Sequence, residues 1–170
     1  MSSPSSSQGH EEWEALVGKA LLRFGDIEYV SLRCLSHIPK DRIANSAGRL
    51  PFASRADLII EMLEARSDRS ADLEKVLGCI RRAKTLAKKR NLIAHNPLML
   101  SLYVNEDETE HIAEYSISSA RSGAETMDLA SLKEFAAEVE DVSSELWMAY
   151  MRLTDSSEVL FGHYPVESWR

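Results

Sequence analysis

The chain has 170 residues, 44% of them hydrophobic and 28% charged, and its formal net charge is -7. This length and apolar content suit one domain with a single hydrophobic core. Its seven Gly and five Pro are few, which favours helices over a turn-rich sheet. An acidic chain is excluded as a general polyanion binder, so any nucleic-acid contact requires a local basic patch.

Cysteine content and hydropathy bear on the cellular compartment. Cys34 and Cys79 lie among apolar residues of expected helices, which predicts buried free thiols and gives no sign of a disulfide framework or a zinc site. No apolar run approaches the roughly 20 residues that a membrane helix needs, and residues 1–9 lack the pattern of a signal peptide. We therefore expect a cytoplasmic protein without membrane contact.

The first half of the chain is predicted to be a tail followed by two helices. Residues 1–10 are too polar to pack and are expected to be disordered. Apolar residues then recur at steps of three and four over residues 11–37, which predicts a long helix. Residues 39–53 contain Gly and Pro and are expected to form a loop. A shorter helix is predicted over residues 54–66, with Ser54 as its N-cap.

A third helix and a hairpin are predicted next. Ser70 is expected to cap a helix that ends near His95, because Asn96-Pro97 disfavours helical backbone. Two segments with alternating apolar residues follow, and a polar turn joins them. They predict a β-hairpin over about residues 98–118.

The chain is predicted to end in a fourth helix and a tail. After an expected loop over residues 119–127, Asp128 caps a long segment with an apolar stripe that runs to about Thr154. Four amphipathic helices bury their stripes most simply in a bundle. We therefore expect a mainly α domain over residues 11–155, with the hairpin inserted between the third and fourth long helices of the bundle, and a C-terminal tail over residues 156–170.

The third predicted helix concentrates positive charge, with seven basic residues and no acidic one between Lys75 and Arg90. On a helical wheel, the stripe expected to face the bundle contains Leu73, Val76, Leu77, Ile80, Ala83, Ala87 and Ala94. A second stripe beside it contains Arg81, Lys84, Lys88, Asn91 and His95. We call its three basic members the cationic track and expect them to bind RNA. The alternative is a solvated face whose cations favour the negative end of the helix dipole.

The segment Arg90-Asn91-Leu92-Ile93-Ala94-His95 ends this helix. Its arginine and histidine are separated by roughly 140° and 7.5 Å on an ideal helix, so they lie on opposite flanks of the apolar stripe. Their side chains cannot stack on each other there. They could instead flank one bound phosphate or reach into a groove shared with a second subunit.

This segment resembles the Arg-x(4–6)-His signature of HEPN domains, with four intervening residues and a polar residue directly after the arginine. Its position late in a long helix of a four-helix bundle also fits that family. The resemblance covers about residues 11–155, in which only the short motif is specific. It implies a HEPN-like four-helix bundle and a homodimer in which two motifs meet and cut RNA without a metal.

The implied reaction suits these side chains. RNA carries its own nucleophile, the 2′-OH, so the protein has to move protons and stabilise charge on the phosphorus centre. We assign proton transfer to His95, phosphate binding and transition-state charge to Arg90, and orientation to Asn91. The alternative is structural, with His95 and Asn91 capping the helix end by bonds to nearby carbonyls.

Glu28 is a supporting candidate. It lies beside the apolar stripe of the first helix, where a carboxylate requires a cationic partner. Arg90 is the partner we expect across the bundle. The alternative is a surface glutamate that covers the core only with its stem.

We therefore predict a metal-independent endoribonuclease that acts on RNA as a homodimer, as a toxin or defence effector with an antitoxin or other regulatory protein as a further partner. No cofactor is expected. Glu108 and His111 have the spacing of a di-iron ligand pair, but they fall in the predicted hairpin turn and have no second copy, so no metal is expected. One alternative is a non-catalytic module of the same fold that binds RNA, a nucleotide or a protein. Another is a helical adaptor whose hairpin and acidic turn bind a partner.

Overall fold

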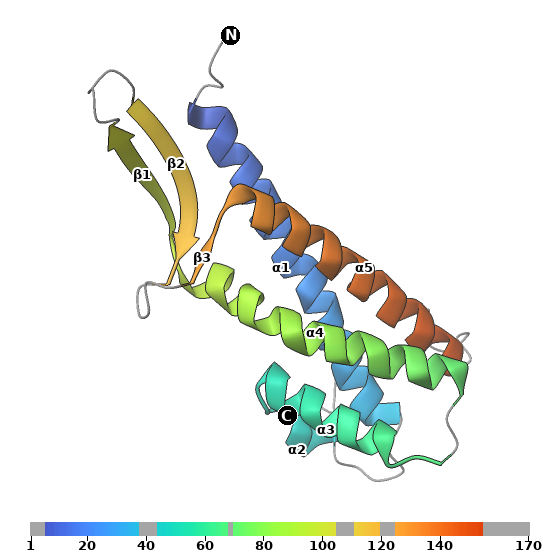
Figure 1. Ribbon diagram of the computed structural model, residues 1–170. Coiled ribbons are helices and arrows are strands. Elements are labelled where there is room, and N and C mark those ends of the chain that lie inside the picture. Colours follow the sequence, from blue (N-terminus) through green and yellow to red (C-terminus); the bar gives the residue numbers. More distant parts are fainter. Residues whose placement is uncertain (1–5, 38–43, 68–69, 105–110, 120–124, 155–170) are drawn as a thin grey trace, which may run out of the picture.

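The computed structural model describes residues 6–37, 44–67, 70–104, 111–119 and 125–154 (Figure 1). Its helices are α1 (Ser6–His37), α2 (Ala44–Ala47), α3 (Phe52–Glu64), α4 (Ala71–His95) and α5 (Leu129–Leu153), and its strands are β1 (Leu98–Val104), β2 (His111–Ser118) and β3 (Thr126–Met127). The prediction of a mainly helical chain with a hairpin between its last two long helices is confirmed. Within these residues, none of the helices is both long and apolar enough to cross a lipid bilayer.

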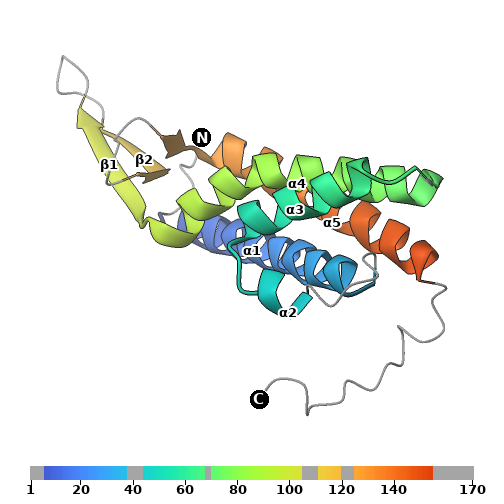
Figure 2. The same cartoon turned by 90° about the horizontal axis from the view of Figure 1, so that it is seen from below.

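The helices pack around one core. Helix α5 lies along α1 and α4, while α3 packs against α4 and α1 (Figures 1 and 2). Side chains with at most 1% exposure include Phe24, Ile27, Val76, Ile80, Phe135 and Leu146. Each such side chain contributes about 1.5–3 kcal/mol to folding. The apolar stripes predicted for α1, α4 and α5 therefore meet in this core.

The ends of α4 and the start of α5 follow from local sequence. The side chain of Ser70 accepts a hydrogen bond from the backbone N–H of Leu73 at 3.2 Å. Asp128 accepts one from the N–H of Ser131 at 2.7 Å, and this bond lowers the pKa of the Asp128 carboxyl. Asn96 leaves the helical region with ψ 147, directly before Pro97. All three predicted boundaries are confirmed.

Helix α1 begins earlier than predicted. It starts at Ser6, so the expectation of a disordered tail through residue 10 is wrong for residues 6–10. The His10 ring meets Tyr115 of β2 edge-on, with ring centres 6.0 Å apart, and a Cβ on Gly9 would lie in van der Waals contact with the same ring. The hairpin therefore supplies this polar first segment with a packing partner. Residues 1–5 and the predicted tail over 156–170 lie outside the described residues.

The expected loop over residues 39–53 also contains helix. One turn, α2, lies within it, and α3 begins at Phe52 rather than after Ser54. Pro51 occupies the N-cap position without a side-chain hydrogen bond, so Ser54 is not the cap. Proline suits the start of a helix because its φ is already fixed near the helical value. The ring of Phe52 packs edge-on against that of Phe24, and the two ring centres are 5.1 Å apart. This contact packs the first residue of α3 against the core.

The sheet is antiparallel with the order β1-β2-β3. Strand β1 pairs with β2 from Leu98 opposite Ile117 to Val104 opposite His111. Strand β3, which lies in the segment expected to be a loop, pairs Met127 with Ile117. A strand of two residues is too short to show an alternating pattern. In both views β1 lies on the outer side of the sheet, away from the helices (Figures 1 and 2).

The last turn of α4 departs from the predicted wheel. Ala94, expected to face the bundle, is exposed, whereas Leu92 and Ile93 are buried. At this end α4 contacts β2, and Leu92 and Met127 line the same pocket. The buried face of the helix therefore turns toward the sheet in this turn, and a single straight stripe no longer describes it.

Candidate functional site

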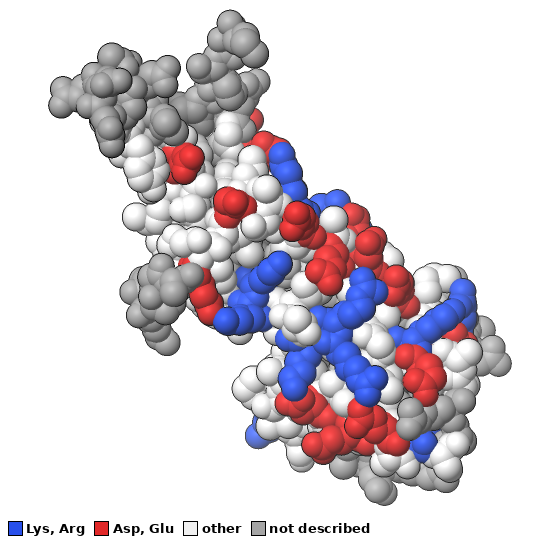
Figure 3. All heavy atoms as spheres, in the orientation of Figure 1, with Lys and Arg blue, Asp and Glu red and all other residues white. Residues whose placement is uncertain are grey.

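The basic residues of α4 gather on one face of the molecule and are bordered by acidic residues (Figure 3). The three residues of the cationic track are exposed, as the helical wheel predicts. Each forms an ion pair with a carboxylate: Arg81 with Glu64, Lys84 with Asp57 and Lys88 with Glu125. Beside the track, Arg82 lies 2.8 Å from a carboxylate oxygen of Glu145 on α5.

These ion pairs reduce the positive potential of the track. An exposed pair contributes little to stability, about 0–1 kcal/mol, but it places a negative charge beside each positive one. An RNA phosphate would have to compete with those carboxylates. The track is therefore a weaker anion-binding surface than the basic run in the sequence implies. The sequence does not show this weakening, because the paired carboxylates are distant from the track along the chain.

Arg90 is held on the opposite flank of α4, against α1. Its Nη2 lies 3.0 Å from Oε1 of Glu28, and each side chain is 29% exposed. Its guanidinium carbon lies 5.6 Å from the centre of the Phe24 ring, which is a cation–π distance. The predicted pairing of Glu28 with Arg90 across the bundle is confirmed. It holds the guanidinium in one place and leaves part of it open to solvent.

A buried arginine extends this arrangement. Arg55 of α3 is 6% exposed and donates from Nε to Oγ of Ser31 at 3.0 Å. Its guanidinium carbon lies 5.8 Å from the centre of the Phe52 ring. Burial lowers the pKa of Arg55, and the Glu28 carboxylate opposes part of that shift. We call the following five residues the Glu28 cluster: Phe24, Glu28, Phe52, Arg55 and Arg90.

Arg55 was not predicted from the sequence. A signal for its burial is nevertheless present, because Arg55, Ile59 and Leu63 follow one another at steps of four and therefore share one face of α3. An arginine on an apolar stripe requires a partner in the core. Its partner, the Ser31 hydroxyl, comes from a different helix and shows no pattern of its own.

Asn91 and His95 lie on the solvent side of α4. Nη1 of Arg90 donates to Oδ1 of Asn91 at 3.2 Å, and both Asn91 and His95 are exposed. The side chain that bonds to a carbonyl at this helix end is Asn96, whose Nδ2 donates to the Leu92 carbonyl at 2.8 Å. Asn96 therefore takes the capping role considered for Asn91 and His95. Within one chain, Arg90 meets Glu28 and Asn91, and His95 remains separate at the surface.

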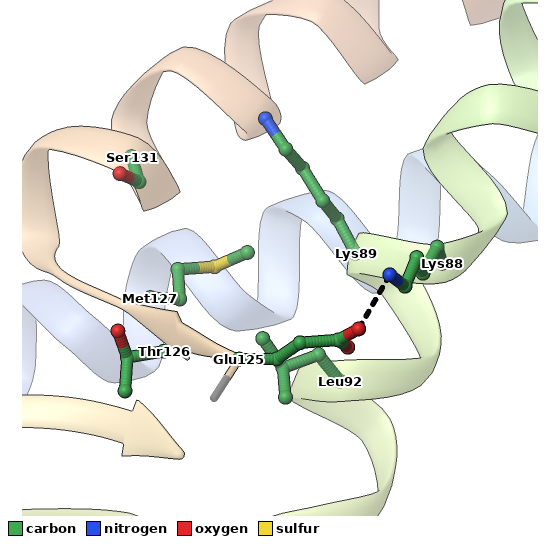
Figure 4. Close-up of a pocket in the computed structure, with 7 residues that line it drawn as sticks. All are labelled: Lys88, Lys89, Leu92, Glu125, Thr126, Met127 and Ser131. Atoms are coloured by element: carbon green, nitrogen blue, oxygen red, sulfur yellow. Dashed lines mark ion pairs between the residues drawn. The ribbon is translucent and has the colours of Figure 1, made fainter. Parts of the chain in front are cut away.

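A pocket of about 360 Å³ opens beside this end of α4 (Figure 4). It is lined by Lys88, Lys89, Leu92, Glu125, Thr126, Met127 and Ser131. Lys88 is paired with Glu125, while the side chain of Lys89 extends toward α5 (Figure 4). Lys89 forms no ion pair with any described residue. The pocket thus combines one cation without a carboxylate partner in the described chain, two hydroxyls and an apolar floor. Of its lining residues, Lys88 alone was predicted from the sequence as a site residue.

The two cysteines are free and buried, as predicted. Burial raises the pKa of Cys34 to about 12 and, together with the neighbouring Glu145, that of Cys79 to about 11. Thiols of this kind are unreactive at neutral pH. Within the described residues, no three or more His, Cys, Asp or Glu side chains are grouped so as to hold a metal ion. Glu108 lies outside those residues.

Comparison of the chain with protein families, curated proteins and solved structures found no match. The resemblance to HEPN domains therefore rests on the motif Arg90-Asn91-Leu92-Ile93-Ala94-His95 and on the mainly helical fold that carries it.

Proposed function

We propose that the protein is a metal-independent endoribonuclease of the HEPN type that acts as a homodimer. The observation that supports this most is the state of the motif at the end of α4. Its arginine is fixed by Glu28 and Phe24 and hydrogen-bonded to Asn91, whereas His95 is exposed and uncommitted to any capping bond among the described residues. A binding group and a proton-transfer group are thus both open to solvent and held on one rigid helix.

Arg90 is the phosphate-binding group in this proposal. A guanidinium can donate two parallel hydrogen bonds to phosphate oxygens, and it keeps its charge throughout the reaction. Because Glu28 and Phe24 already hold it, little side-chain freedom is lost when substrate binds. Asn91, which bonds to Arg90, orients the same phosphate.

His95 carries the proton transfer. The 2′-OH of RNA loses its proton as its oxygen bonds to phosphorus, the bond from phosphorus to the 5′ oxygen breaks, and that oxygen takes up a proton. The products are a 2′,3′-cyclic phosphate and a 5′-OH. One imidazole can accept the first proton and another can supply the second. Two copies of the chain provide one each, which gives a chemical reason for the homodimer.

The pocket beside α4 fits one nucleotide of the substrate. Leu92 in its wall precedes His95 by three residues, about 4.5 Å along the helix axis. The apolar side chains of Leu92 and Met127 suit a base, and Lys89 suits a flanking phosphate. A nucleotide held there would be next to the histidine.

The test is RNA cleavage by the purified protein in the presence of EDTA. His95→Ala and Arg90→Ala should each lower the rate at least about hundredfold while helicity and oligomeric state remain unchanged. His10→Ala is the matched control, because His10 is an exposed histidine on α1, and it should retain the wild-type rate. No cleavage by the wild type, or equal cleavage by His95→Ala, would refute the proposal.

A second candidate function is a non-catalytic module that binds RNA, a nucleotide or another protein. The internal pairing of Arg81, Lys84 and Lys88 favours it, because most of the basic surface is neutralised by the chain's own carboxylates. This candidate predicts binding of an RNA oligonucleotide with no product after prolonged incubation, and equal binding by the His95→Ala variant.

A further inference from the structure

Strand β1 exposes apolar side chains on both of its faces. Met99, Leu100, Leu102, Tyr103 and Val104 are 50%, 46%, 71%, 54% and 50% exposed. In an antiparallel sheet with one buried face, the side chains of alternate residues are covered. Among the described side chains of this sheet, Ile117 on β2 and Met127 on β3 are the buried ones. Within the described residues, strand β1 is therefore largely exposed beyond Leu98.

The outer edge of β1 has none of the features that protect an edge strand. Such edges normally carry a charged residue, a proline or a bulge, because unpaired N–H and C=O groups attract a further strand. The seven residues from Leu98 to Val104 contain no charge and no proline, and they pair with β2 in unbroken register. The edge of β1 that faces away from β2 is thus suited to pairing.

The sequence of β1 is self-complementary about Ser101. If a second β1 pairs antiparallel with Ser101 opposite Ser101, Leu100 lies opposite Leu102, Met99 opposite Tyr103 and Leu98 opposite Val104. A twofold contact requires this reciprocity. We propose that two copies of this chain join through their β1 strands in this register and form one continuous six-stranded sheet.

The net charge of the chain and the exposed apolar area of β1 both favour a second copy of the chain as the partner at the outer edge of β1. The chain carries a net charge of -7, so a like-charged copy meets the least repulsion at a surface without carboxylates, and β1 has no charged residue. Half of a large side chain is on the order of 100 Å². The five exposed side chains of two copies then offer at most about 1,000 Å², which lies at the lower end of specific interfaces. The pairing is therefore a reversible, concentration-dependent one.

This contact is distinct from the one through which two motifs would meet. Each His95 is six residues from the twofold axis, so the two histidines would be up to about 40 Å apart. The proposed contact does not depend on the proposed ribonuclease activity. A chain that uses both contacts forms a closed tetramer when the two twofold axes cross at a right angle, and a larger assembly otherwise.

Sedimentation equilibrium of the full chain over a range of concentrations tests the contact. Leu102→Lys should halve the mass of the assembly, from dimer to monomer or from tetramer to dimer, because it places like charges in the new sheet. Leu22→Lys is the matched control, since Leu22 is 75% exposed on α1, and it should leave the mass unchanged. A monomeric wild type, an unchanged mass for Leu102→Lys, or an equal loss with Leu22→Lys would overturn the proposal. Because Leu102 is itself 71% exposed, neither variant should alter helicity.

Cysteine cross-linking tests the register. Opposite residues of paired strands have Cα atoms about 4.5–5.5 Å apart, which a disulfide can span. Ser101→Cys should therefore form a covalent dimer on mild oxidation, whereas Met99→Cys should not, because the two copies of residue 99 lie about 13 Å apart along the strands. The buried native thiols should keep the wild type free of cross-links. Equal cross-linking at both positions, or none at position 101, would contradict the register.

Discussion

The helical bundle and the hairpin differ in the burial of their apolar side chains. In α5, Leu132 and Phe135 are fully buried, and so are Phe24 and Ile27 of α1 and Val76 and Ile80 of α4. In β1, apolar residues are just as regular in sequence, yet Leu102 is 71% exposed. The bundle thus completes its core within one chain, whereas the hairpin has an apolar surface that the described part of the chain leaves exposed.

This difference separates two roles within one molecule. The motif at the end of α4 is held by contacts inside the chain, above all by Glu28 and Phe24, so its arginine is positioned before any partner arrives. Among the described residues, the outer edge of β1 has no such contacts, and we expect a second copy of the chain to supply them. We therefore expect substitutions in the bundle to change folding and substitutions in β1 to change assembly.

The largest difference between the two regions should appear in the free energy of unfolding when one leucine in each is replaced by alanine. Leu132→Ala should lower the free energy of unfolding by about 2–5 kcal/mol, because it leaves a cavity in the core. Leu102→Ala should change it by no more than about 0.5 kcal/mol. Urea unfolding followed by circular dichroism at low protein concentration, where assembly does not contribute, measures both. Similar losses for the two variants would mean that the hairpin is covered within the chain.

The sequence predicts the bundle well because its signals are local. Apolar spacing of three and four marks the buried faces, and Ser70 and Asp128 mark helix starts through bonds to residues three positions away. The failures are non-local. The early start of α1 involves contact with Tyr115 of the hairpin, and the exposure of Ala94 reflects the packing of α4 against the sheet.

An intermediate effect is expected at Glu28. Glu28→Gln removes the partner of Arg90 and should lower the free energy of unfolding by about 1 kcal/mol, since the pair is partly exposed. RNA cleavage should fall further, on the order of tenfold to a hundredfold, because Arg90 is no longer held in place.

The matched control for this change is Glu12→Gln, in the exposed pair with Lys133 and on the same helix as Glu28. It should cost less than about 0.5 kcal/mol and leave cleavage unchanged. A loss of cleavage with Glu12→Gln equal to that with Glu28→Gln would show that Glu28 has no special role in positioning Arg90.

The smallest effect should come from the cationic track. Replacing Arg81, Lys84 and Lys88 together with Gln should lower RNA affinity by less than about tenfold and reduce the salt slope by less than about 2, because all three are already paired. The double variant Asp57→Asn, Glu64→Gln should instead raise the affinity, since it frees Arg81 and Lys84. Fluorescence anisotropy with an RNA oligonucleotide over a salt series measures both. An unchanged affinity in the double variant would exclude the track from RNA binding.

The candidate site was predictable only where one helix carries it. The wheel separates Arg90 from His95 because both belong to α4. The position of Glu28 beside the apolar stripe of α1 suggested Arg90 as its partner, and the structure shows this pair. The ion pairs of the track with two carboxylates of α3 and with Glu125 could not be predicted from the sequence. Each carboxylate is remote from its partner along the chain, and its spacing in the sequence gives no sign of the pairing. The pocket brings together α4, β3 and α5, so no single segment shows it.

The most direct test of the central claim is the chemistry of RNA cleavage at the motif. A defined RNA oligonucleotide is incubated with the protein in EDTA, beside the same oligonucleotide with a 2′-deoxy residue at the cleavage site, and the product ends are identified by mass. We expect a 2′,3′-cyclic phosphate end from the RNA, no cut at the 2′-deoxy residue, and no cleavage of either oligonucleotide by the His95→Ala variant. Cleavage at the 2′-deoxy residue, or a 2′,3′-cyclic phosphate product from the His95→Ala variant, would contradict the proposed reaction.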